Sequence, residues 1–128
     1  MRKQYHFRQG PQGLLAWDVD RLLVLAAGLD AKEIPLESLG ELDEPYWYEI
    51  GNAVPTCRSI AEHLCLVQAA DLAYPIILCP AGRIMDGMHR VVKALVAGYP
   101  TIAAVRFTEM PAADYVGIAP DDLPYDDA

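Results

Sequence analysis

The stretch "RIMDGMHRVVKALVAG", residues 83–98, gathers charged and protonatable side chains around one glycine. With Asp86 as the N-cap of a helix, the first backbone amides point outward without intrahelical partners, and such an end attracts an anion. Gly87 has no Cβ, so a phosphate can approach its backbone closely. His89, Arg90 and Lys93 share an arc of about 100° on a helical wheel. The predicted phosphate-binding residues are Gly87, Met88, His89, Arg90 and Lys93.

Phosphoryl transfer is the chemistry that such a corner could perform. Amides and Arg90 would hold the phosphate, His89 would neutralise developing charge, and Asp86 would orient a metal or accept a proton. Asp86 and His89 are therefore the candidate catalytic residues, with ATP, ADP or CTP and magnesium as candidate cofactors. No metal site built by the protein alone is predicted. Candidates for a general base lie in an acidic segment that reads equally well as a solvated turn: Glu41, Asp43 and Glu44.

A purely structural interpretation of the same residues stays open. Asp86 can be a simple N-cap, and Arg90 can pair with it at the i, i+4 spacing. His89 can be a packed ring, and Lys93 can be the solvated edge of the helix. The aromatic run containing Trp47 can stack a nucleobase or cover a pocket, or it can anchor its loop on the core. His63 flanks the apolar face of its helix, where a packed histidine is the more common role than a ligand.

The elements around this corner predict the fold class α/β (α+β), with a small mixed sheet packed against helices. Periodicity and capping residues predict helices and strands in alternation. Expected helices cover 18–28, 56–70 and 87–97, and expected strands cover 32–39, 74–80, 84–86 and 101–107. The strand at 84–86 is expected to pair back on the one before it.

The two ends of the chain lack a clear core pattern. Residues 1–13 are predicted to be a flexible N-terminal arm, residues 14–110 a single domain, and residues 111–128 an acidic, Pro- and Asp-rich disordered tail. The first residues imitate a secretory signal, but Asp18 and Arg21 stand directly before the apolar part, so a cytoplasmic location is expected. No apolar window is long enough to predict a membrane span.

Charge and cysteine usage restrict the partners. The chain has 18 acidic and 10 basic residues, a formal net charge of −8, which disfavours sequence-nonspecific DNA binding. A small phosphorylated ligand feels only its local site and is less affected. Three cysteines without zinc-type spacing predict reduced and mostly packed thiols.

The segment "GRIMDGMHRVVKA" and the order of the elements around it resemble the ParB/sulfiredoxin-like domain family, across roughly residues 33–107 and best over Gly82–Gly98. The resemblance implies a small mixed α/β domain that handles nucleotides. Sulfiredoxins carry a cysteine where this chain has Met88, and chromosome-partitioning members that bind CTP have a separate DNA-binding domain. Free-standing serine kinases of the family carry Asp-Gly-His-His-Arg, of which this chain keeps Asp86, Gly87, His89 and Arg90.

The sequence supports three functional hypotheses. The preferred one is binding of a nucleotide or small phosphorylated ligand at the 86–93 corner, with phosphoryl transfer as its extension. The second is a non-enzymatic interaction or regulatory module, in which exposed apolar residues such as Leu66 contact a partner or a second copy in a homodimer. The third, a DNA-associated member, is suggested by the family resemblance alone and opposed by the net charge.

Overall fold

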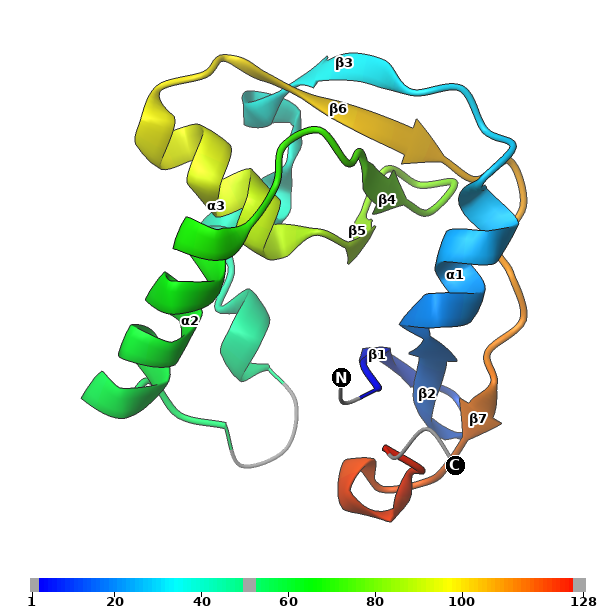
Figure 1. Cartoon of the computed structure of the whole chain (residues 1–128). Coiled ribbons are helices and arrows are strands. Elements are labelled where there is room, and N and C mark those ends of the chain that lie inside the picture. Colours follow the sequence, from blue (N-terminus) through cyan, green and yellow to red (C-terminus); the bar gives the residue numbers. More distant parts are fainter. Residues whose placement is uncertain (1–2, 50–52, 126–128) are drawn as a thin grey trace.

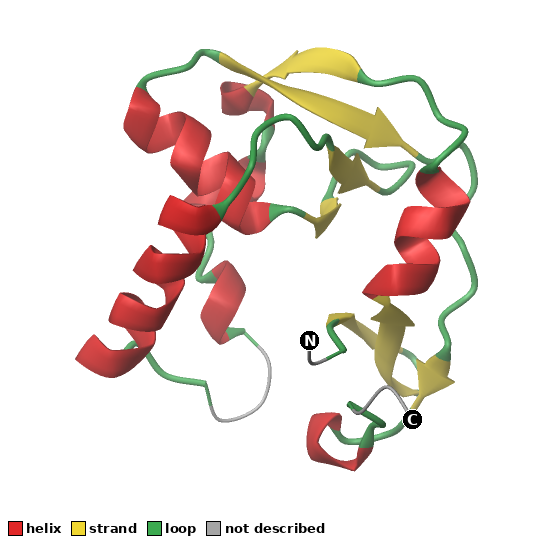
Figure 2. Ribbon diagram, in the orientation of Figure 1, coloured by secondary structure: helices red, strands yellow, loops and turns green. Residues whose placement is uncertain are grey.

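The computed structural model describes residues 3–49 and 53–125, and these form a mixed α+β fold with helices and two sheets (Figures 1 and 2). This confirms the predicted fold class. The helices are α1 (Val19–Ala26), α2 (Cys57–Ala69) and α3 (Met88–Ala97). Short 3-10 helices cover Leu36–Ser38, Gly40–Asp43, Tyr46–Tyr48 and Pro120–Asp122. Among the residues described, no helix is both long and apolar enough to cross a membrane.

The larger sheet is mixed and has the order β3-β6-β4-β5. Its strands are β3 (Lys32–Pro35), β6 (Thr101–Arg106), β4 (Ile76–Leu78) and β5 (Ile84–Asp86). β6 pairs antiparallel with β3 and parallel with β4, and β5 pairs back antiparallel on β4 as predicted. The apolar segment at 74–80 therefore supplies a fully buried internal strand, although a shorter one than its composition suggests.

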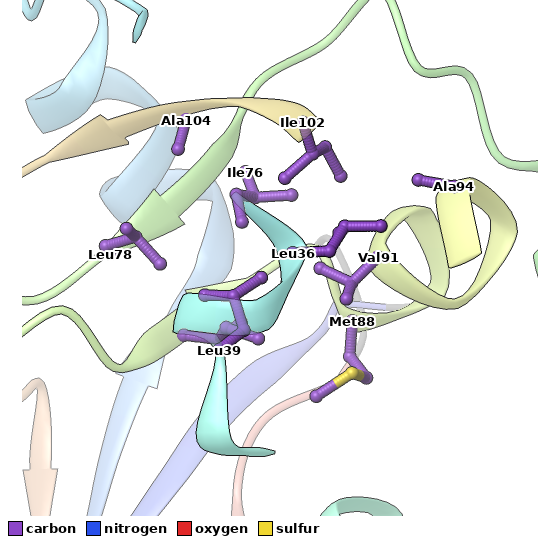
Figure 3. Close-up of a cluster of buried hydrophobic side chains, with 10 residues drawn as sticks. Leu36, Leu39, Ile76, Leu78, Met88, Val91, Ala94, Ile102 and Ala104 are labelled. Carbon is purple, nitrogen blue, oxygen red and sulfur yellow. The ribbon is translucent and has the colours of Figure 1, made fainter. Parts of the chain in front are cut away.

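Alternate residues of β4 face two hydrophobic clusters, one on each side of the sheet. Ile76 and Leu78 belong to a cluster that also contains Met88 and Val91 of α3, and Figure 3 draws these side chains. Ile77 packs on the other side, in a cluster that includes Leu22 and Ala26 of α1 and Trp17. β5 pairs with β4 at the edge of the sheet, and Asp86 is its last residue.

The prediction of a flexible arm at 1–13 is wrong for its described part. β1 (Tyr5–Gly10) and β2 (Gly13–Asp18) form an antiparallel hairpin joined by a two-residue loop, with Gly10 opposite Gly13. His6 and Trp17 lie opposite each other and both are buried. Residues 1–2 lie outside the described residues.

The prediction of a disordered tail at 111–128 is also wrong over residues 111–125, while residues 126–128 lie outside the described part. β7 (Tyr115–Val116) adds to β2 as the third strand of the small sheet. The indole Nε1 of Trp17 donates to the carbonyl of Pro111 at 2.8 Å, and Leu123 is buried. The small sheet thus ties both ends of the described chain together, as Figure 1 shows at lower right.

The cysteines are free thiols, as predicted, but they are not mostly packed. Cys79 is buried, whereas Cys57 and Cys65 are exposed on α2. Thr56 caps α2 through a bond of 3.1 Å from the backbone nitrogen of Ser59, in agreement with the expected helix start.

Candidate functional site

The corner between β5 and α3 is built differently from the predicted N-cap. β5 ends at Asp86, Gly87 is the N-cap residue with φ +112° and ψ +19°, and α3 begins at Met88. The first intrahelical bond runs from the nitrogen of Val91 to the carbonyl of Gly87 at 3.0 Å. The amides of residues 88–90 precede that bond and so have no carbonyl one turn back to pair with. Asp86 therefore does not cap the helix.

Gly87 is required by the fold itself, before any ligand is considered. Its φ lies in the region that side chains rarely adopt. A Cβ at this position would stand 2.6 Å from Cγ2 of Ile76 on the buried strand β4. The glycine therefore allows α3 to leave the sheet tightly, and the phosphate argument is not needed to explain it.

Arg90 joins three segments of the chain through its guanidinium group. Nη1 donates to the carbonyls of Tyr74 and Pro75, each at 2.9 Å, and Nη2 donates to Asp86 at 2.7 Å. The side chains of Arg90 and Asp86 are only 14% and 18% exposed. The structure thus contains the i, i+4 pair of the structural interpretation, and the cation is committed to an internal bridge.

The prediction that Lys93 belongs to the phosphate stripe is wrong for the structure as it stands. Its Nζ donates to the carbonyl of Gln68 at 3.0 Å and to that of Ala70 at 2.6 Å. Both carbonyls lie at the C-terminal end of α2, where a cation satisfies unpaired acceptors and the helix dipole. Lys93 therefore holds α2 to α3.

His89 forms an aromatic cluster with His63 of α2 and Trp47 of the 3-10 helix Tyr46–Tyr48. Nε2 of His89 and Nδ1 of His63 are 2.8 Å apart, and the ring centroids are 5.1 Å apart at 22°. These values place the two imidazoles edge to edge in nearly one plane. The indole of Trp47 stacks on both rings, at 4.1 Å from His63 and 4.8 Å from His89.

This cluster keeps both histidines neutral near pH 7. Burial, and then the neighbouring His63, lower the pKa of His89 from 6.5 to about 4. Burial also lowers the pKa of His63. In a neutral pair one ring nitrogen donates and the other accepts. The predicted role of His89 as a cation that neutralises developing charge is therefore not supported by its surroundings.

The remaining predicted residues contribute backbone or lie elsewhere. The Met88 side chain is buried in the core, so only its amide is available. Glu41 is buried and accepts a hydrogen bond from the nitrogen of Ile84. Glu44 pairs with Arg83 at 2.6 Å. Both are occupied by these structural contacts.

A cleft of about 690 Å³ lies between α1, the C-terminal end of α2 and the start of α3. The predicted site residues on its wall are Asp86, Gly87, His89 and Arg90. Two further carboxylates, Asp20 and Asp71, line the cleft as well. Carboxylates outnumber cations here, so the locally basic pocket expected from the sequence is not observed.

No protein-built metal centre is apparent in the described residues 3–49 and 53–125, which hold no group of three or more His, Cys, Asp or Glu side chains suited to an ion. Magnesium keeps several waters and is often bound through one or two carboxylates together with substrate phosphates. The Asp86 carboxylate fits that limited role.

Sequence reasoning missed the contact between His63 and His89. The two residues are 26 positions apart, and no spacing rule links them. A signal was present in Trp47, which lies in a Tyr-Trp-Tyr run, because aromatic side chains contribute large buried areas to cores and interfaces. The carbonyl partners of Arg90 and Lys93 left no signal in the sequence, since every residue has a carbonyl.

Comparison with known proteins adds no family to this description. No protein-family model matches the chain, and neither the curated proteins nor the solved structures contain a match.

Proposed function

We propose that the cleft between α1 and the start of α3 binds a small phosphorylated ligand, a nucleotide such as ATP, ADP or CTP, as its magnesium complex. One observation carries the proposal. Four of the predicted site residues, Asp86, Gly87, His89 and Arg90, line one cleft at the beginning of a helix whose first amides lack intrahelical partners.

The phosphate would bind to the amides of residues 88–90, where the partial positive charge of the helix dipole is greatest. Arg90 remains a fixed positive group beside them, since Asp86 and two carbonyls hold its guanidinium in one orientation. Neutral His89 contributes a hydrogen-bonding ring.

Magnesium follows from the charge of the cleft. Asp20, Asp71 and Asp86 repel a bare phosphate, while a magnesium complex carries less negative charge. Asp86 is the carboxylate beside the helix end and would take part in holding the ion, which when bound neutralises phosphate charge. Phosphoryl transfer is the extension of this proposal: the γ-phosphoryl group of ATP would pass to water or to an acceptor hydroxyl, and the ADP released would be the readout.

Calorimetry and thermal unfolding with ATP, ADP, CTP and inorganic phosphate, each with and without magnesium, test the proposal. A ligand at about 100 times its Kd stabilises the folded state by about 2.7 kcal/mol. We expect stabilisation by at least one nucleotide, larger with magnesium. Arg90→Ala should remove it, whereas Arg106→Ala, which loses an arginine that also bonds a backbone carbonyl, should not.

Arg90→Ala also removes an internal bridge, so its fold is checked by circular dichroism. Asp86→Asn is the second variant, because it removes negative charge from the helix end and keeps the shape. It should raise the affinity for free phosphate and reduce the benefit of magnesium. The proposal is contradicted if no ligand binds the natural protein. It is also contradicted if the Arg90→Ala and Asp86→Asn variants bind the ligands as tightly as the natural protein does.

A further inference from the structure

Tyr74 carries an aromatic ring on the wall of the cleft between α1, α2 and α3. Its side chain is 66% exposed and lines that cleft. Within residues 3–49 and 53–125, its ring and hydroxyl have no hydrogen bond or aromatic partner. Five of the seven tyrosines do have such a partner: Tyr5, Tyr46, Tyr48, Tyr115 and Tyr125. Tyr74 is thus an aromatic side chain that the chain itself does not use.

The backbone of Tyr74 is held in place from two sides. The carboxylate of Asp71 accepts a hydrogen bond from the nitrogen of Ala73 at 2.9 Å, and its carbonyl accepts one from the nitrogen of Tyr74 at 3.3 Å. Nη1 of Arg90 donates to the carbonyl of Tyr74 at 2.9 Å. Pro75 follows and disfavours a helical backbone at Tyr74. Because this backbone is already ordered, a ligand that contacts the ring pays little to order it.

Arg90 also sets how far Tyr74 lies from the proposed phosphate position. Its guanidinium bonds Asp86, at the end of β5, and the carbonyl of Tyr74. One arginine side chain therefore separates Tyr74 from the amides of residues 88–90. A nucleoside triphosphate is longer than an arginine side chain. Phosphates at those amides and a base at Tyr74 can thus belong to one molecule.

The surroundings of Tyr74 suit a flat, uncharged group. Leu23 of α1 and Leu66 of α2 line the same cleft and are 48% and 49% exposed. The volume of about 690 Å³ is within the range of small-molecule sites. The carboxylates of the cleft oppose a second anionic group but not a neutral aromatic one.

The aromatic run at 46–48 does not offer the same platform. The indole of Trp47 already stacks on His63 and His89, at 4.1 and 4.8 Å. The hydroxyl of Tyr48 shares a hydrogen bond with that of Ser59. Neither residue lines the cleft, whereas Tyr74 does.

We propose that the nucleotide in the cleft stacks its base on the ring of Tyr74, and that the preferred ligand is a purine nucleotide. The inference rests on the proposed function for the position of the phosphates. Every base has a π-face that an aromatic side chain can stack on, and the two rings of a purine cover more of the phenol than the single ring of a pyrimidine. Because neither partner is charged, the stacking is insensitive to salt, unlike the phosphate contacts.

Calorimetry with ATP, CTP and ribose 5-triphosphate, each with magnesium, is the first test. Ribose 5-triphosphate lacks only the base. We expect ATP to bind more tightly than CTP, and at least about 5-fold more tightly than ribose 5-triphosphate. Tyr74→Ala should remove both differences and leave the affinity for ribose 5-triphosphate unchanged, while Tyr74→Phe should keep them.

Tyr99→Ala is the matched control. Tyr99 is 54% exposed, follows the end of α3 and does not line the cleft, so its loss should change none of these affinities. Circular dichroism checks that each variant is folded. Equal affinities of the natural protein for ATP and for ribose 5-triphosphate overturn the stacking, and so does an unchanged affinity for ATP in Tyr74→Ala. Binding of CTP as tightly as ATP overturns the purine preference.

Saturation-transfer NMR with millimolar adenosine separates the base from the phosphates. We expect transfer to the adenine protons in the natural protein and its loss in Tyr74→Ala. Binding of ribose 5-triphosphate without any transfer to adenosine overturns the stacking and leaves the phosphate site in place. Transfer to adenosine without binding of any triphosphate supports the stacking and contradicts the phosphate site. If neither binds, both proposals are overturned.

Discussion

Helices α2 and α3 lie side by side, yet they use their apolar residues in opposite ways. Met88, Val91 and Ala94 of α3 are buried against the larger sheet. Ile60 and Leu64 of α2 are more than half exposed. α3 leaves directly from β5 through Gly87 and so lies on the sheet, whereas α2 packs beside α3. An amphipathic pattern thus predicts an apolar face, but it does not say whether the same chain covers that face.

Two side chains of α3 hold α2 in place. Lys93 bonds carbonyls at the C-terminal end of α2, and His89 bonds His63 near its middle. Lys93 and the Nε2 atom of His89, both expected to face a ligand, therefore connect the two helices. The difference between a core helix and a peripheral helix can be tested by breaking these connections in turn.

The largest loss of stability is expected at Gly87, where α3 packs closely on the larger sheet. Gly87→Ala places a Cβ at 2.6 Å from Cγ2 of Ile76 and imposes a side chain at φ +112°. Strain and overpacking together should lower the free energy of unfolding by about 3 kcal/mol. Gly98→Ala, at φ +82° with no atom within 4 Å of the new Cβ, should cost about 1 kcal/mol. Urea denaturation measures both, and equal losses would contradict the packing argument.

The second effect concerns the histidine contact and its pH dependence. The folded-state pKa of His89, about 4, is below the ordinary 6.5, so the unfolded state binds the proton more tightly. This contribution to stability is complete above pH 6.5 and is lost as the pH falls toward 4. This contribution to the free energy of unfolding is about 2 kcal/mol, a figure reduced because the imidazole ring is partly exposed to solvent.

His89→Phe removes the titrating group and keeps an aromatic ring beside Trp47. Its unfolding free energy should therefore fall less than that of the natural protein between pH 7 and pH 4. His6, whose pKa burial and Arg8 lower to about 3, adds an acid loss common to both proteins. Parallel pH profiles for the two proteins would show that His89 is not held neutral by the fold.

The smallest effect is expected at the end of α2. Lys93→Met keeps the length of the side chain but removes the charge that satisfies the carbonyls of Gln68 and Ala70. We expect a loss of about 1 kcal/mol, with faster hydrogen exchange in the last turn of α2. Lys32→Met on the exposed strand β3 is the matched control. An equal change in both would mean that Lys93 does not cap α2.

Part of the fold followed from local signals. The cap at Thr56, the glycine after α3 and the apolar run at 74–80 predicted α2, α3 and β4 correctly, because these signals act within a few residues. The hairpin at 5–18 was missed although two glycines flank its two-residue loop. Its many basic residues suggested a solvated arm, and the burial of His6 depends on Trp17 across the hairpin.

Four of the residues named from the sequence lie together, but their electrostatic surroundings differ from those expected. Asp86, Gly87, His89 and Arg90 do line one cleft. A helical wheel gives the direction in which a side chain leaves the helix, but the charged group of a long side chain lies several ångströms from that point. Arg90 reaches the carbonyls of Tyr74 and Pro75, which are brought there by the path into β4.

By itself the amino-acid sequence determined where α3 stops and, to within one residue, where it starts, since chain geometry and capping act locally. Only the tertiary structure decided what its charged groups do. Lys93 and Arg90 meet carbonyls from distant segments, and His89 meets His63, because β4 and α2 are positioned by packing. Polar groups that are removed from water must find partners, and folding determines which ones come within reach.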